Sequence, residues 1–304
     1  MISLVIPVYN EEQLIDRLLD RACQALGSIA DDFEIICIDD GSTDASLEKL
    51  ISYRQQEKRV KIVVLSKNFG HQAAYTAGLT YAKGGYIAMI DADLQDPPEL
   101  LTNMYEKLVR ENLDVVYGKR TVRQERWLKR LSIRLFHKAF RHVIQVKDAD
   151  NVGNFSLFTR RVLHALLALP EKNRYLPGLR FFVGFKQDYI EYERPDRVGG
   201  PSKMSTFELI RLALDAFFSF SDLPIKICLY TGLAGILIFC TGFVYTLVSK
   251  FIGIAPFGWS STIFSIYFLG SVQLVFLGIL GEYIHRIYKE IQNRPIFIVR
   301  EFIE

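Results

Sequence analysis

Tyr86-Ile-Ala-Met-Ile90, followed directly by Asp91-Ala-Asp-Leu-Gln-Asp-Pro-Pro98, is the stretch that decides how this chain folds. Its first half is a short apolar run, which predicts a buried strand of a parallel sheet. Its second half places two carboxylates, those of Asp91 and Asp93, where that strand ends. Open α/β sheets bind ligands at this end, and such oxygens suit Mg²⁺ or Mn²⁺. The pattern therefore favours a metal site over a solvated surface turn, which is the alternative.

Three strand-like runs precede this stretch, at residues 2–9, 33–38 and 60–65. Helical patterns lie between them, one opening at Asn10 and another running from about Gln72 to Lys83. The alternation of strand and helix predicts a doubly wound, mostly parallel sheet. No Gly-x-Gly-x-x-Gly follows the first strand, which argues against a dinucleotide-dependent dehydrogenase.

The composition excludes other classes of protein. The chain has 304 residues, enough for one large or two smaller domains, and its 37 basic and 34 acidic residues give a net charge of only +3. So balanced a charge does not indicate a nucleic-acid partner. The four cysteines have neither metal-binding nor redox spacing, so reduced structural thiols are expected.

Two long segments, residues 227–249 and 251–281, contain no charged residue. Each exceeds the roughly 20 residues needed to cross a bilayer, which favours two membrane spans over a helical hairpin buried in a soluble core. The loop between them carries one Lys, whereas both flanks are richer in Lys and Arg. Both chain ends are therefore expected in the cytoplasm.

A third segment, residues 119–141, contains nine Lys or Arg and a single acid, Glu125. Aromatic and aliphatic residues alternate with these cations, which indicates a basic amphipathic helix. Such helices lie on anionic membranes; an ordinary solvated surface helix is the alternative. A second interfacial helix is expected between Phe207 and Phe220.

Four motifs in order resemble glycosyltransferase family 2: Val5-Ile-Pro-Val-Tyr-Asn-Glu11, Asp39-Asp-Gly-Ser-Thr-Asp44, Asn68-Phe-Gly70 and Asp91 to Pro98. Further motifs narrow the resemblance to the polyprenyl-phosphate glycosyltransferases of the dolichol-phosphate mannose synthase and bactoprenol glucosyltransferase type: Arg197-Val-Gly-Gly-Pro-Ser-Lys203, Ser219-Phe-Ser221 and Gly281 to Pro295. The resemblance runs nearly end to end. It implies a GT-A fold, a nucleotide-sugar donor and a polyprenyl phosphate acceptor at the bilayer, and it allows a homo-oligomer.

The resemblance also implies roles for single residues on the donor side. The nucleoside pocket would be lined by five residues: Pro7, Tyr9, Glu11, Asp39 and Asp91. Asp39 could accept a hydrogen bond from the N3–H of uracil, while the alternative for Asp39-Asp40-Gly41-Ser42 is a tight turn that caps a helix. Asp93 and Gln95 would hold Mg²⁺ or Mn²⁺ together with the donor pyrophosphate.

On the acceptor side, Arg120 and Arg134 match family positions that contact phosphates, a task for which guanidinium groups are apt. The acceptor phosphate is expected at a set of four residues: Arg134, Arg197, Ser202 and Lys203. Without the resemblance, the Gly/Pro-rich loop that holds the last three is equally well read as a flexible linker. Catalysis is expected to depend on Asp93, Arg120 and Arg134.

One segment departs from the family pattern. Many relatives carry acids where Asn151 and Asn154 stand, and an amide cannot take a proton. The assignment of a general base is therefore open: Asp148 or Asp150 could substitute, or either could only cap a turn. The five histidines suggest no ligand set, so His71 is expected to be a lone surface or packed side chain.

These observations predict a cytoplasmic GT-A domain over residues 1–203, an interfacial helix over 204–223, a two-span anchor over 224–283 and a cytoplasmic tail over 284–304. The expected protein is a multi-pass enzyme of the bacterial inner membrane that transfers one sugar, from a UDP-sugar donor, to undecaprenyl phosphate with inversion. The alternatives are a hydroxyl-directed or processive glycosyltransferase and a non-catalytic nucleotide-binding membrane component.

Overall fold

A computed structural model describes residues 1–120, 152–172, 174–193 and 258–304, together with a few single positions between 230 and 252. The chain divides into two units. Of the described residues, the first unit contains those up to 193 and Pro295–Glu304, and the second contains those from 230 to Arg294.

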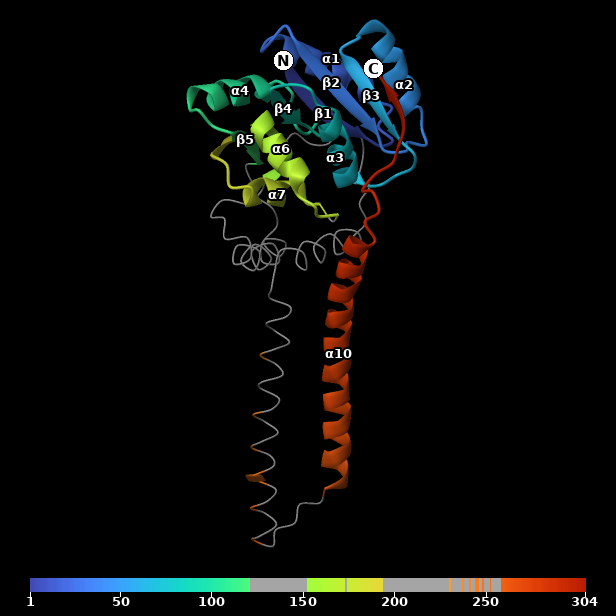
Figure 1. Ribbon diagram of the computed structural model, residues 1–304, viewed down its shortest axis with the longest axis vertical. Helices are drawn as coiled ribbons and strands as arrows, with labels where there is room; N and C mark the ends of the chain where they lie inside the picture. The colour runs from blue at the N-terminus through green and yellow to red at the C-terminus, as the bar shows by residue number, and fades with distance from the viewer. Residues whose placement is uncertain are drawn as a thin grey trace. The chain divides into compact units, whose positions relative to one another are not determined.

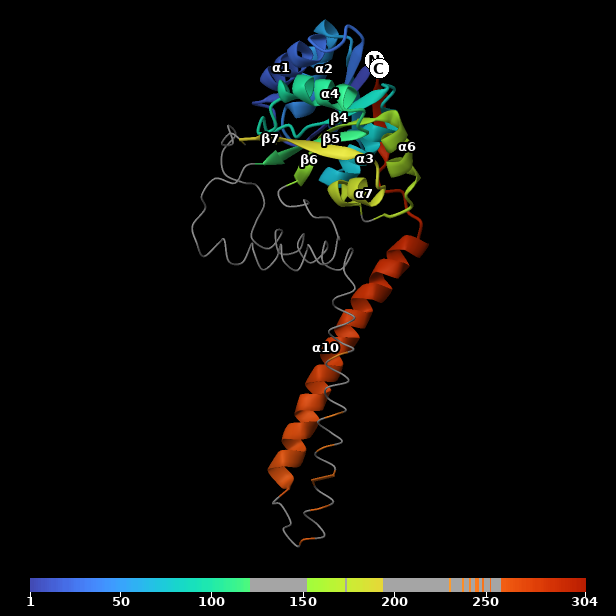
Figure 2. The same cartoon turned by 90° about the vertical axis from the view of Figure 1, so that its left-hand side faces the viewer.

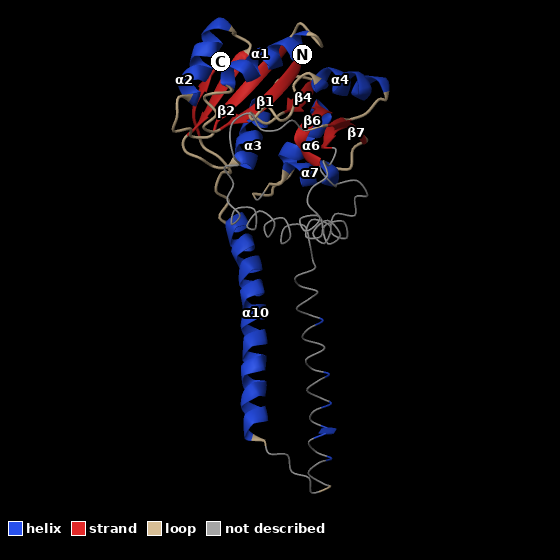
Figure 3. Ribbon diagram, turned by 180° about the vertical axis from the view of Figure 1, so that it is seen from behind, coloured by secondary structure: helices blue, strands red, loops and turns tan. Residues whose placement is uncertain are grey.

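The described part of the first unit is built on one sheet, with strand order β7-β5-β6-β4-β1-β2-β3-β8 (Figures 1 and 3). Strands β6 and β8 run antiparallel to their neighbours, and the other strands run parallel to one another. The predicted mostly parallel sheet is thus confirmed. The strands are β1 (Ile2–Val8), β2 (Phe33–Asp39), β3 (Val60–Leu65), β4 (Tyr86–Met89), β5 (Val115–Arg120), β6 (Val152–Thr159), β7 (Gln187–Tyr192) and β8 (Val299–Ile303).

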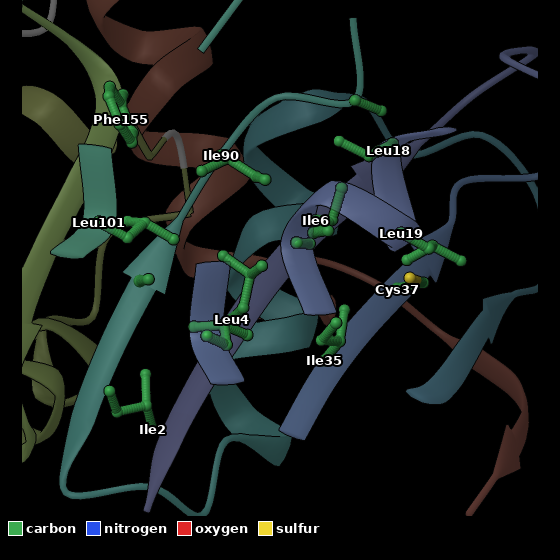
Figure 4. Close-up of a cluster of buried hydrophobic side chains, with 14 of the residues drawn as sticks. Ile2, Leu4, Ile6, Leu18, Leu19, Ile35, Cys37, Ile90, Leu101 and Phe155 are labelled. Carbon is green, nitrogen blue, oxygen red and sulfur yellow. The ribbon is translucent and has the colours of Figure 1, made fainter. Parts of the chain in front are cut away.

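Helices cover both faces of this sheet (Figure 2). One face carries α1 (Ile15–Gly27), α2 (Ser46–Gln56) and α4 (Leu100–Arg110), and the other carries α3 (His71–Tyr81), α6 (Arg160–Ala168) and α7 (Leu176–Phe182). Successive side chains of a strand point to opposite faces. Leu4 and Ile6 therefore join the first core, shown in Figure 4, while Val5 joins the second.

The first helix begins later than the sequence predicts. The helix expected to open at Asn10 starts at Ile15. The backbone N–H groups of Asn10, Glu11 and Glu12 instead donate to side chains of Ser42 and Asp44, in the loop that follows β2, and of Ser46, the first residue of α2. These long-range bonds hold residues 10–12 in a loop, so the acids there do not form a first helical turn.

The C-terminal residues return to the sheet. Strand β8 pairs antiparallel with β3 and forms one edge of the sheet. Lys61 forms ion pairs with Glu304 at 2.7 Å and with the buried Glu34 at 2.9 Å. The segment expected to be a tail thus contains a strand that the sequence analysis did not identify.

The second unit contains α10 (Trp259–Ile291), in which Phe268–His285 has a mean hydropathy of 1.4. Within the described part of the chain this is the one helix long and apolar enough to cross a membrane, which by itself is weak evidence for a span. Most of the first predicted span lies outside the described residues. The predicted basic helix after Arg120 and the predicted interfacial helix between Phe207 and Phe220 also lie outside them.

Candidate active site at the carboxyl ends of the strands

The predicted donor-side residues share one edge of the sheet. Pro7 lies in β1, Asp39 ends β2, and Asp91 follows β4 by two residues. These three strands are parallel neighbours, and Val8 is directly opposite Asp39 in the register. Their carboxyl ends therefore meet at the edge where open α/β sheets bind ligands. Tyr9, 41% exposed, continues from β1 at the rim of this edge.

The loops after β1 and β2 are bound to each other. Glu11 N donates to Ser46 Oγ, Glu12 N donates to Asp44 Oδ2, and Thr43 N donates to Asn10 Oδ1. Asp44 also accepts the N–H of Ser46, the first residue of α2, through Oδ1 at 3.0 Å, which agrees with the helix-capping role offered as the alternative for this motif. Asp39 also serves the turn, because its Oδ1 accepts the Ser42 N–H at 3.2 Å.

Asp40 fixes the loop between β3 and α3. Its two carboxylate oxygens accept the N–H groups of Phe69, at 2.7 Å, and Gly70, at 3.0 Å. Burial raises the pKa of Asp40, and the charge of Asp39 adds to this, although the two N–H bonds and the charge of His71 oppose it. Gly41 lets the two loops approach, because a Cβ there would lie 2.7 Å from the Asn68 nitrogen. The Asn-Phe-Gly motif is therefore held against the end of β2.

Asp91 is the centre of a partly buried cluster of side chains. Its Oδ1 accepts a hydrogen bond from the Tyr75 hydroxyl at 2.7 Å and lies 3.0 Å from His71 Nε2. Burial alone would raise the pKa of Asp91, but the bond to His71 and its charge outweigh burial and lower that pKa to about 2. Burial likewise would lower the pKa of His71, yet Asp91 raises it overall. His71 is exposed and packs edge-on against Tyr75, as expected of a surface or packed histidine, but it is not alone, because it is also the ionic partner of Asp91.

Partly exposed and buried side chains alternate along the turn after β4. Asp91, Asp93 and Gln95 remain partly open, whereas Ala92, Leu94 and Asp96 are buried. Asp93 Oδ1 accepts the Gln95 N–H at 3.0 Å, and Leu94 between them adopts φ 58°. This left-handed conformation is strained for a leucine, and burial of its side chain holds it in place. Asp93 and Gln95 are thereby two partly exposed residues with side-chain oxygens in one hydrogen-bonded turn.

These oxygens fit a divalent cation that takes its remaining ligands from a substrate. The described residues contain no group of three or more His, Cys, Asp or Glu side chains able to hold a metal by themselves. Mg²⁺ is usually bound by one or two carboxylates plus phosphates. One carboxylate and one amide agree with that arrangement, and they do not agree with a closed structural metal site.

Arg120, at the end of β5, is held beside this turn by two side chains. The Tyr192 hydroxyl donates to Asp96 Oδ1 at 2.6 Å, and Arg120 Nε donates to the Tyr192 oxygen at 3.3 Å. Arg120 Nη2 lies 3.8 Å from Asp96 Oδ1, and Asp96 is fully buried. Burial would lower the pKa of Arg120, but the charge of Asp96 outweighs it and raises the pKa. Arg120 therefore stays a cation, and its charge reaches Asp91 as well.

Asn154 is the described member of the pair of amides that depart from the family pattern. It lies near the start of β6, and its Oδ1 accepts from Gln72 Nε2 of α3 at 3.4 Å. Other predicted site residues lie outside the described residues, where the structure does not test their roles. These are Arg134, Asp148, Asp150, Asn151, Arg197, Ser202 and Lys203.

Four side chains of the site were not identified from sequence as functional: Gln72, Tyr75, Asp96 and Tyr192. Asp96 stands within the quoted Asp91–Pro98 motif, so a third acid in that turn was a usable signal. Tyr192 carried no such signal, because its partner Asp96 is 96 residues away in the chain.

Comparison with known proteins places the chain among glycosyl transferases. A family model described as glycosyl transferase family 2 matches residues 3–167. An uncharacterized glycosyltransferase of Synechocystis is 40% identical over 99% of this chain and 95% of its own. A prophage-derived bactoprenol glucosyl transferase of Shigella flexneri is 36% identical over 99% and 97%, respectively.

A solved structure is similar in fold. Glucosyl-3-phosphoglycerate synthase of Mycobacterium tuberculosis, crystallised with Mn²⁺, UDP and phosphoglyceric acid, aligns with a TM-score of 0.56. The alignment covers 72% of this chain and 76% of that one at 16% identity. At this identity the likeness establishes the fold, in agreement with the observed mixed, mostly parallel sheet.

Proposed function

Because the chain belongs to glycosyl transferase family 2, we propose that it transfers one sugar from a nucleotide donor to a polyprenyl phosphate, with inversion. The observation that carries this proposal is the placement of Arg120 beside the Asp91–Asp96 turn by Asp96 and Tyr192. That placement supports Arg120 as a cation that could bind a phosphate close to the candidate metal ligands. Near full-length similarity to a bactoprenol glucosyl transferase supports the lipid phosphate as acceptor.

The proposed donor is a UDP-sugar. The nucleoside would bind over the carboxyl ends of β1 and β2, where Pro7, Tyr9 and Asp39 lie. A carboxylate at Asp39 can accept the N3–H of uracil, which adenine does not offer. The UDP bound in the structurally similar synthase supports this choice.

Asp93 and Gln95 would hold Mg²⁺ or Mn²⁺, and the Mn²⁺ in that same synthase supports metal use. Bound there, the ion would supply positive charge for the diphosphate of the departing nucleotide. Asp91 would remain ionised, because His71 and Tyr75 keep its pKa low. We assign it to donor binding, since a carboxylate engaged with two side chains is poorly placed to remove a proton.

The proposed chemistry needs no general base. A phosphate monoester has a second pKa of about 6 and is largely dianionic at pH 7, whereas a hydroxyl acceptor must lose a proton as it attacks. The protein's contribution would then be positioning and charge stabilisation. Arg120 supplies a fixed guanidinium for this task, and Asn154, which cannot take a proton, is compatible with it.

We propose that the reaction takes place at the inner face of a bacterial plasma membrane. Helix α10 would form the second of two membrane spans, the first being residues 227–249, with both chain ends and the catalytic sheet in the cytoplasm. The return of the chain from α10 to β8 supports one part of this arrangement: the catalytic sheet and the C-terminus would lie on the same side of the membrane.

The experiment that tests the proposed function is a donor screen. Purified full-length protein is incubated with undecaprenyl phosphate and, separately, UDP-glucose, UDP-galactose, UDP-N-acetylglucosamine, GDP-mannose and a no-donor control. One UDP-sugar is expected to yield a lipid product that carries one sugar through a phosphodiester and is cleaved by mild acid. Absence of lipid product with every donor would contradict the proposal, and a polymer of sugars would favour a processive enzyme.

A further inference from the structure

The side chain of Asn154 lies at the same edge of the sheet as Asp91. Strands β4 and β6 are antiparallel, with Met89 opposite Ser156. Asn154 precedes Ser156 by two residues on β6, and Asp91 follows Met89 by two residues, so both residues lie beyond the same end of this strand pair. The Ser156 hydroxyl donates a hydrogen bond to the main-chain carbonyl oxygen of Asn154 at 2.8 Å, and Asn154 is 8% exposed. The residue is thus fixed in the wall of the candidate site.

Gln72 connects Asn154 to α7. The backbone N–H of Leu176 donates to Gln72 Oε1 at 2.9 Å, and Gln72 Nε2 lies 3.4 Å from Asn154 Oδ1. Gln72 also directly follows His71, the partner of Asp91. One amide side chain therefore joins helix α3, strand β6 and helix α7 around the site.

The orientation of both amides follows from this chain of hydrogen bonds. A backbone N–H can only donate, so the atom of Gln72 that faces Leu176 must be its oxygen. The other end of the Gln72 amide is then the NH₂ group, which also only donates. The atom of Asn154 that faces Gln72 must therefore be Oδ1. It follows that the NH₂ group of Asn154 points away from Gln72.

We propose that Gln72 is a positioning residue that holds Asn154 with its NH₂ group toward the bound substrates. There Asn154 donates a hydrogen bond to an oxygen acceptor, either on the transferred sugar or on the acceptor phosphate. The inference rests on the proposed function, which supplies these two ligands. It assigns to Asn154 the role of a neutral donor rather than that of a base.

The physical consequence is that two hydrogen-bond donors, Asn154 and Arg120, would face the bound substrates in this part of the site. Arg120, at the end of neighbouring strand β5, is also a donor without any acceptor atom, and its guanidinium lies near Gly153. A reversed Asn154 amide would place a carbonyl oxygen where ligand oxygens arrive. Two oxygen atoms that face each other have no hydrogen to share and cannot form a hydrogen bond. The orientation of the Asn154 amide therefore matters as much as its presence.

Gln72→Glu tests this orientation without altering Asn154. The new carboxylate still accepts from the Leu176 N–H, but it offers an oxygen to Asn154 in place of an NH₂ group. Asn154 is then expected to turn its own NH₂ toward position 72 and its oxygen toward the substrate. Loss of one hydrogen bond of this kind should raise the KM of the affected substrate about five- to tenfold, with a smaller change in kcat.

A double-mutant cycle separates positioning from general damage. In an Asn154→Ala background there is no amide to reverse, so Gln72→Glu should change KM less than twofold. Gln55→Glu, on the exposed face of α2, adds the same charge as a matched control and should behave like the parent. Melting temperatures of all variants in detergent show whether any of them is misfolded.

Two binding measurements identify which oxygen is contacted. Contact with the sugar predicts that Gln72→Glu weakens binding of UDP-glucose but not of UDP. Contact with the acceptor phosphate predicts that donor binding is unchanged and only the KM for undecaprenyl phosphate rises. The inference would be overturned if Gln72→Glu changed KM equally with and without the Asn154 side chain. It would also be overturned if Gln72→Glu changed KM no more than Gln55→Glu does. If the unmutated protein binds UDP-glucose but transfers no sugar, the proposed function is contradicted and not this inference. The double-mutant cycle is then evaluated from the Kd values for UDP-glucose.

Discussion

Asp93→Asn is expected to lower kcat about a hundred- to a thousandfold, the range seen when one preorganised charge-stabilising group is removed. The substitution removes a full charge from the open side of the turn after β4. It retains Oδ1, which accepts the Gln95 N–H, so the turn and the fold should survive. The measurement is kcat at saturating donor, acceptor and Mn²⁺, alongside the melting temperature.

The matched control is Asp16→Asn, on the surface of α1, where the exposed carboxylate pairs with Lys49 at 3.2 Å. An exposed pair of this kind contributes little, so kcat should stay within twofold of the parent. Chelation of the parent with EDTA should abolish transfer, and added Mn²⁺ or Mg²⁺ should restore it. Unchanged turnover in EDTA would show that Asp93 and Gln95 do not act through a metal.

Arg120→Ala is expected to lower kcat/KM about a hundredfold, because a fixed cation is lost from a site that must bind several phosphate oxygens. Arg120→Lys should recover only part of the activity, since an ammonium lacks the planar fork of donors. Loss of Arg120 also leaves the buried Asp96 without its cation, so stability must be measured together with activity.

Tyr192→Phe tests whether the anchoring of Arg120 matters. It removes the hydroxyl that donates to Asp96 and accepts from Arg120, while the guanidinium itself remains. The expected loss in kcat/KM is about tenfold, in the same direction as Arg120→Ala. Tyr105→Phe on α4 is the control, because that ring packs against Tyr86 away from the site. Equal activity of the two phenylalanine variants would mean that Tyr192 does not position Arg120.

Much of the fold follows from local sequence patterns. The apolar runs at residues 2–9, 33–38, 60–65 and 86–90 become β1, β2, β3 and β4, with ends that differ by at most one residue. A strand buried on both faces leaves a continuous apolar signal. The register of β6 and the return of β8 leave no comparable signal, because both depend on pairing with strands far away in the chain.

The candidate site, like the fold, could be predicted only in part from local sequence. Asp91 and Asp93 could be predicted because they directly follow a recognisable strand. The partners of Asp91 could not, since the 3.0 Å contact with His71 depends on how α3 packs on the sheet. The position of Arg120 could be carried over from the family, whereas its dependence on Tyr192 required the pairing of β5 with β7.

The central claim is that the acceptor is a phosphate that is already ionised. The most direct measurement compares undecaprenyl phosphate with undecaprenol at equal concentration, using the donor identified by the screen, across pH 6.5 to 8.5. We expect transfer to the phosphate only, with kcat nearly constant over this range because no base must be deprotonated. Comparable transfer to the free alcohol, giving an acid-stable glycoside, would contradict it.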